Sequence, residues 1–128
     1  MKLLFDTHAF IWWDNEPEKL SRKALDHCLD RTNILILSVA SVWEIQIKMQ
    51  LGKLKLSLPI SELIESQQRT NNIQILPIEL SHVLALDNLP LHHKDPFDRL
   101  LIAQTQTEDA YIISKDPMLA NYTVNLIW

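Results

Sequence analysis

Four acidic residues lie where a predicted strand gives way to a helix or at the start of a predicted helix: Asp6, Glu44, Asp98 and Asp116. In a parallel α/β sheet, the segments that follow the carboxyl ends of the strands gather along one edge, where ligands bind. Carboxylates far apart in the chain would meet there and repel one another, unless some take up protons or a cation neutralises them. Oxygen ligands of this kind suit Mg²⁺ or Mn²⁺, and a phosphodiester is the natural substrate of such a site.

Several of these acids also have a purely structural explanation. Asp95 and Asp116 each precede a proline, the pattern of a helix N-cap followed by proline at the first helical position. Ser41 and Glu44 have the spacing of a capping box. The apolar neighbours of Asp6 and Glu44 weigh against an idle surface charge, because buried carboxylates are normally paired or metal-bound.

Apolar runs of strand length alternate with helical patterns along the chain, which predicts βαβ units and a mostly parallel sheet of about five strands. We expect strands at residues 3–5, 34–37, 73–76, 111–113 and 124–127. We expect helices at residues 8–13, 17–30, 39–51, 59–70, 79–87 and 96–108. Gly52, the only glycine, should follow the third of these helices as its C′ residue. The last connection is short for a crossover, so spacing leaves the direction of the fifth strand open.

Length and composition are those of one domain, which we expect to span all 128 residues. The single cysteine, Cys28, cannot form an intramolecular disulfide, which favours a reducing cytoplasm. No run approaches the roughly 20 apolar residues of a membrane helix, so we expect no membrane association. Asp6 interrupts the short apolar stretch where a signal peptide would continue. The net charge of −4 argues against a broadly basic nucleic-acid surface, but not against a nuclease, because the acidic cluster supplies much of it.

Four stretches together form a recognisable pattern. They are residues 3–8, residues 38–54 with Ser41-Val42-Trp43-Glu44-Ile45, residues 89–104 with Asp95-Pro96-Phe97-Asp98-Arg99, and residues 114–117. In these stretches the chain resembles the PIN-domain family and, within it, the VapC-type ribonuclease toxins of bacterial toxin–antitoxin pairs. The resemblance runs from the first strand to Trp128, and its most specific part is the motif around Asp95 and Asp98 at this distance from an early strand-end Asp.

The resemblance implies a three-layer α/β/α sandwich and Mg²⁺- or Mn²⁺-dependent cleavage of RNA by a cytoplasmic enzyme. It implies that four acids form the catalytic and metal-binding quartet: Asp6, Glu44, Asp98 and Asp116. Asp95 would be an accessory metal ligand, with helix capping as the equal alternative, and Thr7 and Ser114 would be supporting polar groups. We also expect a cognate antitoxin as partner, and a homodimer.

Three residues beside the central motif could steer RNA phosphates towards the acids: His93, Lys94 and Arg99. The alternative for this segment is a solvated loop. Three tryptophans are expected in the core or at an interface rather than as platforms for nucleobases: Trp12, Trp13 and Trp43.

Two other functions compete with a nuclease. A phosphohydrolase could form a phospho-aspartate at Asp6, but phosphatases of the haloacid-dehalogenase type carry a second Asp two residues later, where this chain has His8. A non-catalytic PIN-fold protein-binding module would have lost at least one acid of the quartet, and none is replaced.

Overall fold

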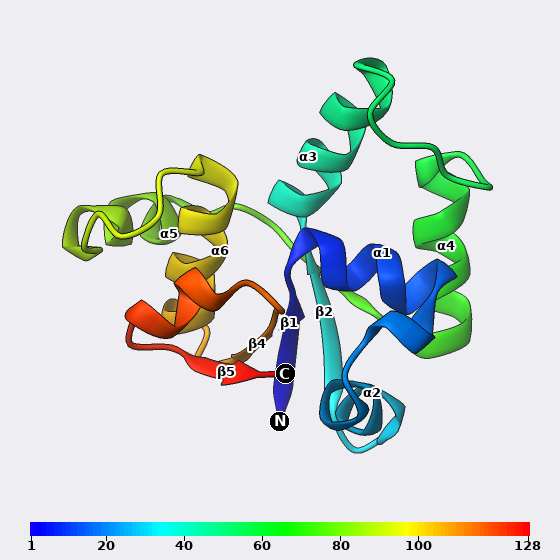
Figure 1. Cartoon of the computed structure of the whole chain (residues 1–128), viewed down its shortest axis with the longest axis horizontal. Helices are drawn as coiled ribbons and strands as arrows, with labels where there is room; N and C mark the ends of the chain where they lie inside the picture. The colour runs from blue at the N-terminus through cyan, green and yellow to red at the C-terminus, as the bar shows by residue number, and fades with distance from the viewer.

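Five short strands form one parallel sheet in the computed structural model, which describes residues 1–128 (Figure 1). They are β1 (Lys2–Phe5), β2 (Ile34–Ser38), β3 (Gln74–Leu76), β4 (Tyr111–Ile113) and β5 (Asn125–Ile127). Their order across the sheet is β3-β2-β1-β4-β5. Leu4 of the central strand pairs with Ile36 on one side and Ile112 on the other. A strand covered on both faces needs apolar residues in a continuous run, as β1 and β2 have.

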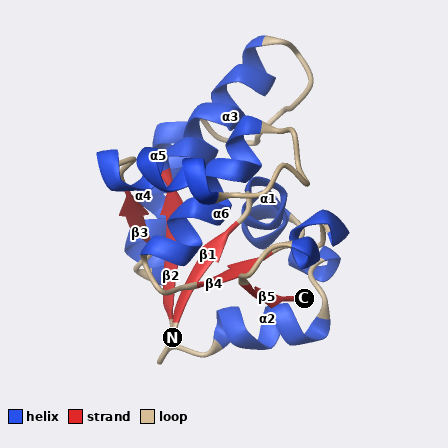
Figure 2. Ribbon diagram, turned by 90° about the vertical axis from the view of Figure 1, so that its left-hand side faces the viewer, coloured by secondary structure: helices blue, strands red, loops and turns tan.

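Helices connect the strands and cover both faces of the sheet. The α-helices are α1 (Thr7–Asn15), α2 (Arg22–Leu29), α3 (Val39–Gln50), α4 (Ile60–Asn71), α5 (Leu80–Leu84) and α6 (Pro96–Thr107). Short 3₁₀ helices are η1 (Pro17–Lys19), η2 (Ala85–Asn88) and η3 (Pro117–Asn121). In Figure 1, α1, α2 and α4 lie on one side of the sheet and α5 and α6 on the other, while α3 projects beyond the end of β2. Figure 2 shows the sheet between these layers, so the predicted α/β/α sandwich is confirmed.

Two apolar clusters fill the space between the sheet and its helices. Because successive residues of a strand point to opposite faces, Leu3 and Phe5 belong to one cluster and Leu4 to the other. Phe5 meets Phe10 of α1 edge to face, with ring centroids 5.9 Å apart. The central strand is therefore held from both sides, which fixes the direction in which the chain leaves it.

The prediction of one continuous helix over residues 17–30 is wrong. Residues 17–30 form η1 and then α2, because Leu20 between them is extended, with φ −72° and ψ 148°. Ser21 starts the new helix by accepting a hydrogen bond from the N–H of Ala24 at 3.1 Å. Leu20 is buried in the core beside β1, and this burial favours the break over a continuous helix. The helix expected over 79–87 is present as α5 followed directly by η2.

The structure settles two points at the ends of elements. β5 pairs with β4 in the parallel direction, which the short connection had left open, and η3 makes this crossover. Gly52 has φ +70°, and the N–H of Lys53 donates to the carbonyl of Lys48 at 2.9 Å. This is the expected glycine-terminated helix end. None of the helices combines the length and apolar character that crossing a membrane requires.

Candidate active site

An open cleft of about 520 Å³ lies where the carboxyl ends of β1 and β4 meet the helices. It is lined by Asp6, His8, Trp12, His93, Asp98, Lys115, Asp116 and Pro117. These residues come from the start of α1, the loop and first turn of α6, and the segment after β4. Three of the four predicted acids therefore meet in one cleft, although they belong to separate parts of the chain.

Asp6 is the N-cap of α1. Its Oδ1 accepts a hydrogen bond from the N–H of Ala9 at 2.7 Å, and its own N–H donates to the carbonyl of Ile113 in β4 at 3.0 Å. Burial raises the pKa of its carboxyl, and the nearby charge of Asp116 adds to this, against the hydrogen bonds from Ser114 and Ala9. A buried carboxyl with a raised pKa next to a second acid is typical of functional sites.

Glu44 lies within α3 and is 7% exposed. Its Oε1 accepts a hydrogen bond from the hydroxyl of Thr7 at 2.7 Å, and its Oε2 pairs with the ammonium of Lys48 at 2.9 Å. The alternative explanation of Glu44 as part of a capping box is wrong, because Ser38 caps α3 and Ser41 is already inside it. Glu44 does not line the cleft, but its charge is close enough to raise the pKa of Asp98.

Asp98 occupies the first turn of α6, and Asp95 is the N-cap of that helix. Asp95 accepts two hydrogen bonds through its Oδ1 from backbone N–H groups of the first turn, at 2.8 and 3.1 Å. Burial raises the pKa of Asp98 to about 7, and the negative charges of Asp95, Glu44 and Asp6 act in the same direction against the opposing effect of His93. Burial is therefore the main cause of the raised pKa of Asp98, and the opposing effect of His93 does not outweigh it.

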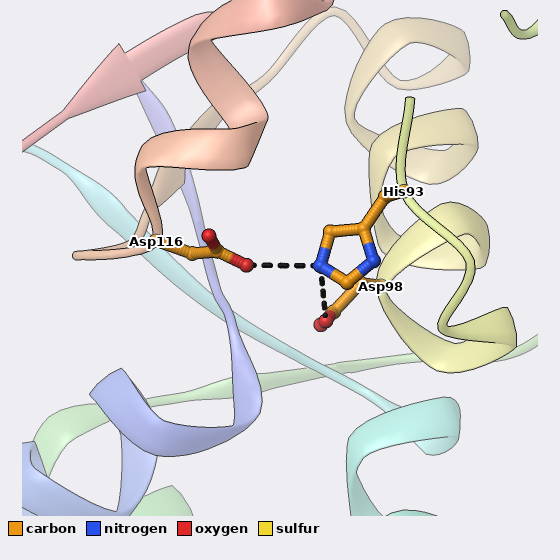
Figure 3. A group of neighbouring side chains, drawn as sticks. All are labelled: His93, Asp98 and Asp116. Carbon is orange, nitrogen blue, oxygen red and sulfur yellow. Dashed lines mark hydrogen bonds and ion pairs between the residues drawn. The ribbon is translucent and has the colours of Figure 1, made fainter. Parts of the chain in front are cut away.

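His93 bridges two of the acids, as Figure 3 shows. Its Nε2 lies 3.1 Å from an oxygen of Asp98 and 2.9 Å from an oxygen of Asp116. Its Nδ1 accepts a hydrogen bond from the N–H of Asp95 at 3.1 Å, so the ring proton is assigned to Nε2, which donates to both carboxylates. The backbone N–H of His93 donates in turn to the hydroxyl of Tyr122 at 2.7 Å, which holds the loop in place.

The donor set of the cleft fits a hard divalent cation. Ligand atoms of His93, Asp98 and Asp116 lie within 4.8 Å of one another. Because Nε2 of His93 carries a proton, the available ligands are carboxylate oxygens, to which Asp6 adds the oxygen that the helix cap leaves free. Oxygen-only ligands suit Mg²⁺ or Mn²⁺. Burial, and after it repulsion by other acids, raises the pKa values of Asp6 and Asp98, and a bound cation would neutralise these carboxylates.

Comparison with known proteins identifies the family. The family model described as the PIN domain matches residues 3–125. The chain belongs to the PIN domain family. It is 25% identical over 122 residues to Ribonuclease VapC22 of Mycobacterium tuberculosis (strain ATCC 25618 / H37Rv), covering 94% of this chain and 91% of that protein.

Solved structures have the same fold as this PIN domain. One is the crystal structure of VapBC2 from Rickettsia felis bound to a DNA fragment from their promoter, with a TM-score of 0.73, 12% identity, and coverage of 98% of this chain and 97% of that chain. Another is VapBC-1 from nontypeable Haemophilus influenzae, with a TM-score of 0.58, 14% identity, and coverage of 98% and 96%. At such low identity these likenesses concern the fold.

The basic residues of this PIN domain are arranged differently from the sequence-based expectation. Arg99 donates to the carbonyl of Pro90 at 2.9 Å, and neither Arg99 nor Lys94 lines the cleft. Lys115 lines it instead, and sequence reasoning missed this residue. The available signal was its position between a strand end and Asp116. The steering role of His93, Lys94 and Arg99 remains a prediction.

The two expected supporting hydroxyls of this PIN domain both touch the acids. The Oγ of Ser114 accepts the N–H of Asp116 at 3.0 Å, and its hydroxyl bonds the carboxylate of Asp6. Thr7 bonds Glu44 and, at 3.1 Å, the hydroxyl of Ser41. These neutral groups orient the carboxylates without cancelling their charge.

Proposed function

We propose that this PIN domain is a Mg²⁺- or Mn²⁺-dependent endoribonuclease and the toxin of a toxin–antitoxin pair. The convergence of Asp6, Asp98 and Asp116 in one cleft carries this proposal. The relative named Ribonuclease VapC22 supports the ribonuclease activity. The same fold occurs in chains of VapBC structures and of a toxin–antitoxin complex from Klebsiella pneumoniae. These likenesses support the pairing with an antitoxin.

In the proposed mechanism, Asp6, Asp98 and Asp116 would hold the cation, and Glu44 and the accessory Asp95 would contribute negative charge around it. When bound, a cation of this kind lowers the pKa of a water molecule and neutralises charge on the attacked phosphate. The chain itself supplies pre-organisation. Asp6 is fixed by the cap of α1 and by Ser114, so little reorganisation accompanies binding.

The contacts of Glu44, Asp116 and His93 indicate which groups would accept or donate protons in the site. Glu44 or Asp116 would complete the metal shell or accept the proton of the attacking water. Glu44 keeps one oxygen on Thr7 and the other on Lys48, and of the two acids only Asp116 lines the cleft. His93 donates from Nε2 to Asp98 and Asp116 in the chain alone. With these carboxylate oxygens engaged elsewhere, the same N–H would be available to donate to a phosphate oxygen.

The proposal includes an antitoxin partner, a homodimeric toxin and a cytoplasmic location. Large apolar side chains are exposed on α3 and α5, with Trp43 56%, Leu80 73% and Leu84 58% exposed. Exposed apolar residues of this size are often covered by protein partners. Cys28 is buried, and burial raises the pKa of its thiol to about 12. A single unreactive thiol of this kind suits a reducing compartment.

Neither competing function has an observation in its favour. A phosphohydrolase acting through a phospho-aspartate at Asp6 needs a second carboxyl at position 8, and the exposed imidazole of His8 lies there. A non-catalytic protein-binding module has no need for Asp6, Asp98 and Asp116 to share a cleft in which they repel one another.

The test of the proposed function is cleavage of a panel of tRNA, rRNA and mRNA by the purified chain with Mn²⁺, with Mg²⁺ and with a chelator. We expect cleavage only with a divalent cation, and loss of at least about 100-fold in Asp98→Asn, because removing a metal-binding charge acts on the chemical step, where about 1.4 kcal/mol is tenfold. Asp98→Asn also removes a negative charge from the first turn of α6, which should cost at most about 1 kcal/mol of stability. Asp87→Asn, at an exposed acid of η2, is the matched control.

Growth of cells that express the chain tests the toxin assignment. Wild type should arrest growth and Asp98→Asn should not. Full cleavage activity in a folded Asp98→Asn protein would leave Asp98 as a helix-start residue and end the nuclease interpretation.

A further inference from the structure

The structure separates three tryptophans that the sequence places in one class. Trp13 stacks on Phe5 in the core, with ring centroids 6.1 Å apart. Trp43 is 56% exposed on α3, where it meets Phe97 edge to face, and it does not line the cleft. Trp12 alone lines the cleft that holds the acids. Trp12 and Trp13 both pack against the core, as expected, but only Trp12 is also part of the cleft wall.

Trp12 belongs to a row of aromatic rings along the cleft. His8 precedes it by four residues on α1, so the two side chains lie on one face of the helix, with ring centroids 6.0 Å apart. Trp12 also packs against Trp128, at 5.9 Å between centroids. Asp6 caps the same helix, so the row starts beside the acids. Packing of this kind holds the Trp12 ring in place before any ligand arrives, which reduces the entropy cost of binding.

Beside its acids, the lining of the cleft includes one basic side chain and aromatic rings. Lys115 is exposed and lines the cleft next to Asp116, and its ammonium can contact a phosphate. Sites for single-stranded nucleic acid combine positive groups that follow the backbone with aromatic side chains on which bases stack. The cleft contains both kinds of group within one set of lining residues.

We propose that Trp12, supported by its contacts with His8 and Trp128, is a stacking site for an unpaired nucleobase next to the phosphate that is cleaved, with Lys115 on the backbone. This inference rests on the proposed ribonuclease function and assigns the residues that would contact the base and the neighbouring phosphate. In a duplex the faces of the bases are stacked inside the helix, so a duplex cannot use this site unless a base leaves the stack.

The experiment measures RNA binding in an Asp98→Asn background, which prevents cleavage. The probes are a fluorescein-labelled oligouridine of roughly 12 nucleotides, within the range that single-strand sites span, the same strand without bases, and the oligouridine paired with oligoadenosine. The oligouridine should bind more tightly than the other two. Trp12→Leu should weaken its binding by roughly 5- to 100-fold, the usual range for losing one stacked base. Trp12→Phe, which keeps an aromatic face, should retain most of the affinity.

Two controls separate stacking from a general effect of mutation. Trp43→Leu removes an exposed tryptophan outside the cleft and should leave the affinity unchanged. The baseless strand should bind Trp12→Leu and its parent equally. Thermal melts verify that each variant is folded. Should Trp12→Leu fail to fold, His8→Ala removes an exposed ring of the same row and should weaken binding of the oligouridine but not of the baseless strand.

Equal effects of Trp12→Leu and Trp43→Leu, or an equal loss for the baseless strand, would overturn the stacking site. Failure of this inference is distinct from failure of the proposed function. If wild type cleaves RNA and Asp98→Asn does not, while the Trp12 and His8 variants bind normally, only the stacking site is wrong. If binding depends on Trp12 and on the bases but wild type never cleaves RNA, the nuclease assignment is wrong and the binding site stands.

Discussion

Single acidic side chains of this protein combine helix capping with a second contact in the cleft. Asp116 caps η3 through Oδ1, which accepts the N–H of Met118 at 2.9 Å, while its Oδ2 bonds His93. Asp6 likewise caps α1 through one oxygen. A carboxylate has two oxygens, so a cap that uses one leaves the other free to face the cleft. The capping interpretation and the metal-binding interpretation of these acids are therefore compatible.

The raised pKa of Asp98 predicts how the metal-free protein responds to pH. Folding raises this pKa from 3.8 to about 7, so the folded state favours the protonated carboxyl. The contribution to stability is fully present below about pH 4 and is lost as pH rises through about 7, because the unfolded chain releases its proton first. We expect the melting temperature in chelator to fall between about pH 5 and pH 8, and to fall less in Asp98→Asn.

The difference between the pH profiles of wild type and Asp98→Asn isolates the titration of Asp98 from that of the other groups. Asp26→Asn, at an exposed acid of α2, should behave as wild type. The same pH profile for wild type and Asp98→Asn would show that the carboxyl of Asp98 ionises as an ordinary surface acid.

At the scale of elements, two helices that carry acids are joined through a buried polar contact. The hydroxyl of Ser38, which caps α3, donates to the side-chain carbonyl of Gln104 in α6. The amide of Gln104 contacts the fully buried imidazole of His82 at 3.3 Å. Because α3 carries Glu44 and α6 carries Asp98, this contact helps to fix the two acids relative to each other.

Substitution of Gln104 should therefore cost stability. Gln104→Leu keeps the approximate size of the side chain but leaves the hydroxyl of Ser38 without its acceptor, and an unsatisfied buried polar group costs about 1–3 kcal/mol. Gln106→Leu is a matched control on the same helix, because Gln106 is exposed and bonds the carbonyl of Thr123. Urea unfolding would measure both. Similar losses for the two variants would show that the buried contact contributes little.

At the scale of the whole molecule, strand order places the cleft. Chain order runs from β1 outward through β2 to β3, then returns across β1 to β4 and β5. The connection that follows β1 therefore runs over one face of the sheet, and the connection that follows β4 runs over the other. In open α/β sheets such a reversal opens a crevice at the carboxyl ends of the strands, where ligands bind. Asp6 follows β1 and Asp116 follows β4, which brings the two acids to this crevice.

Cation binding at the crevice should stabilise the whole fold. A ligand that binds only the folded state adds about 2.7 kcal/mol at 100 times its dissociation constant, so Mg²⁺ or Mn²⁺ should raise the melting temperature in a concentration-dependent manner. Asp6→Asn should weaken this response, whereas Asp26→Asn, far from the cleft lining, should retain it. An undiminished response in Asp6→Asn would place the cation at another site.

Much of this arrangement follows from local patterns in the sequence. The apolar run at residues 34–37 predicts a buried strand because its neighbours must cover both faces. Gly52 predicts a helix end because glycine adopts positive φ at little cost, and its φ in the structure is +70°. The four acids are predicted to meet because parallel strands end at a common edge, and three of them line the cleft, whereas Glu44 does not. Each of these inferences needs only spacing within a short segment and a general rule of α/β sheets.

Tertiary structure decides which side chains meet across segments that are far apart in the chain. Local spacing does not distinguish Trp12 from Trp13, and both pack against the core, yet only Trp12 lines the cleft. Nor does it select Lys115 over Lys94 for the cleft, or place the ring of His93 between two acids. These outcomes depend on strand order, crossover path and loop anchoring. The free energy of these long-range contacts arises only when the separate segments pack together.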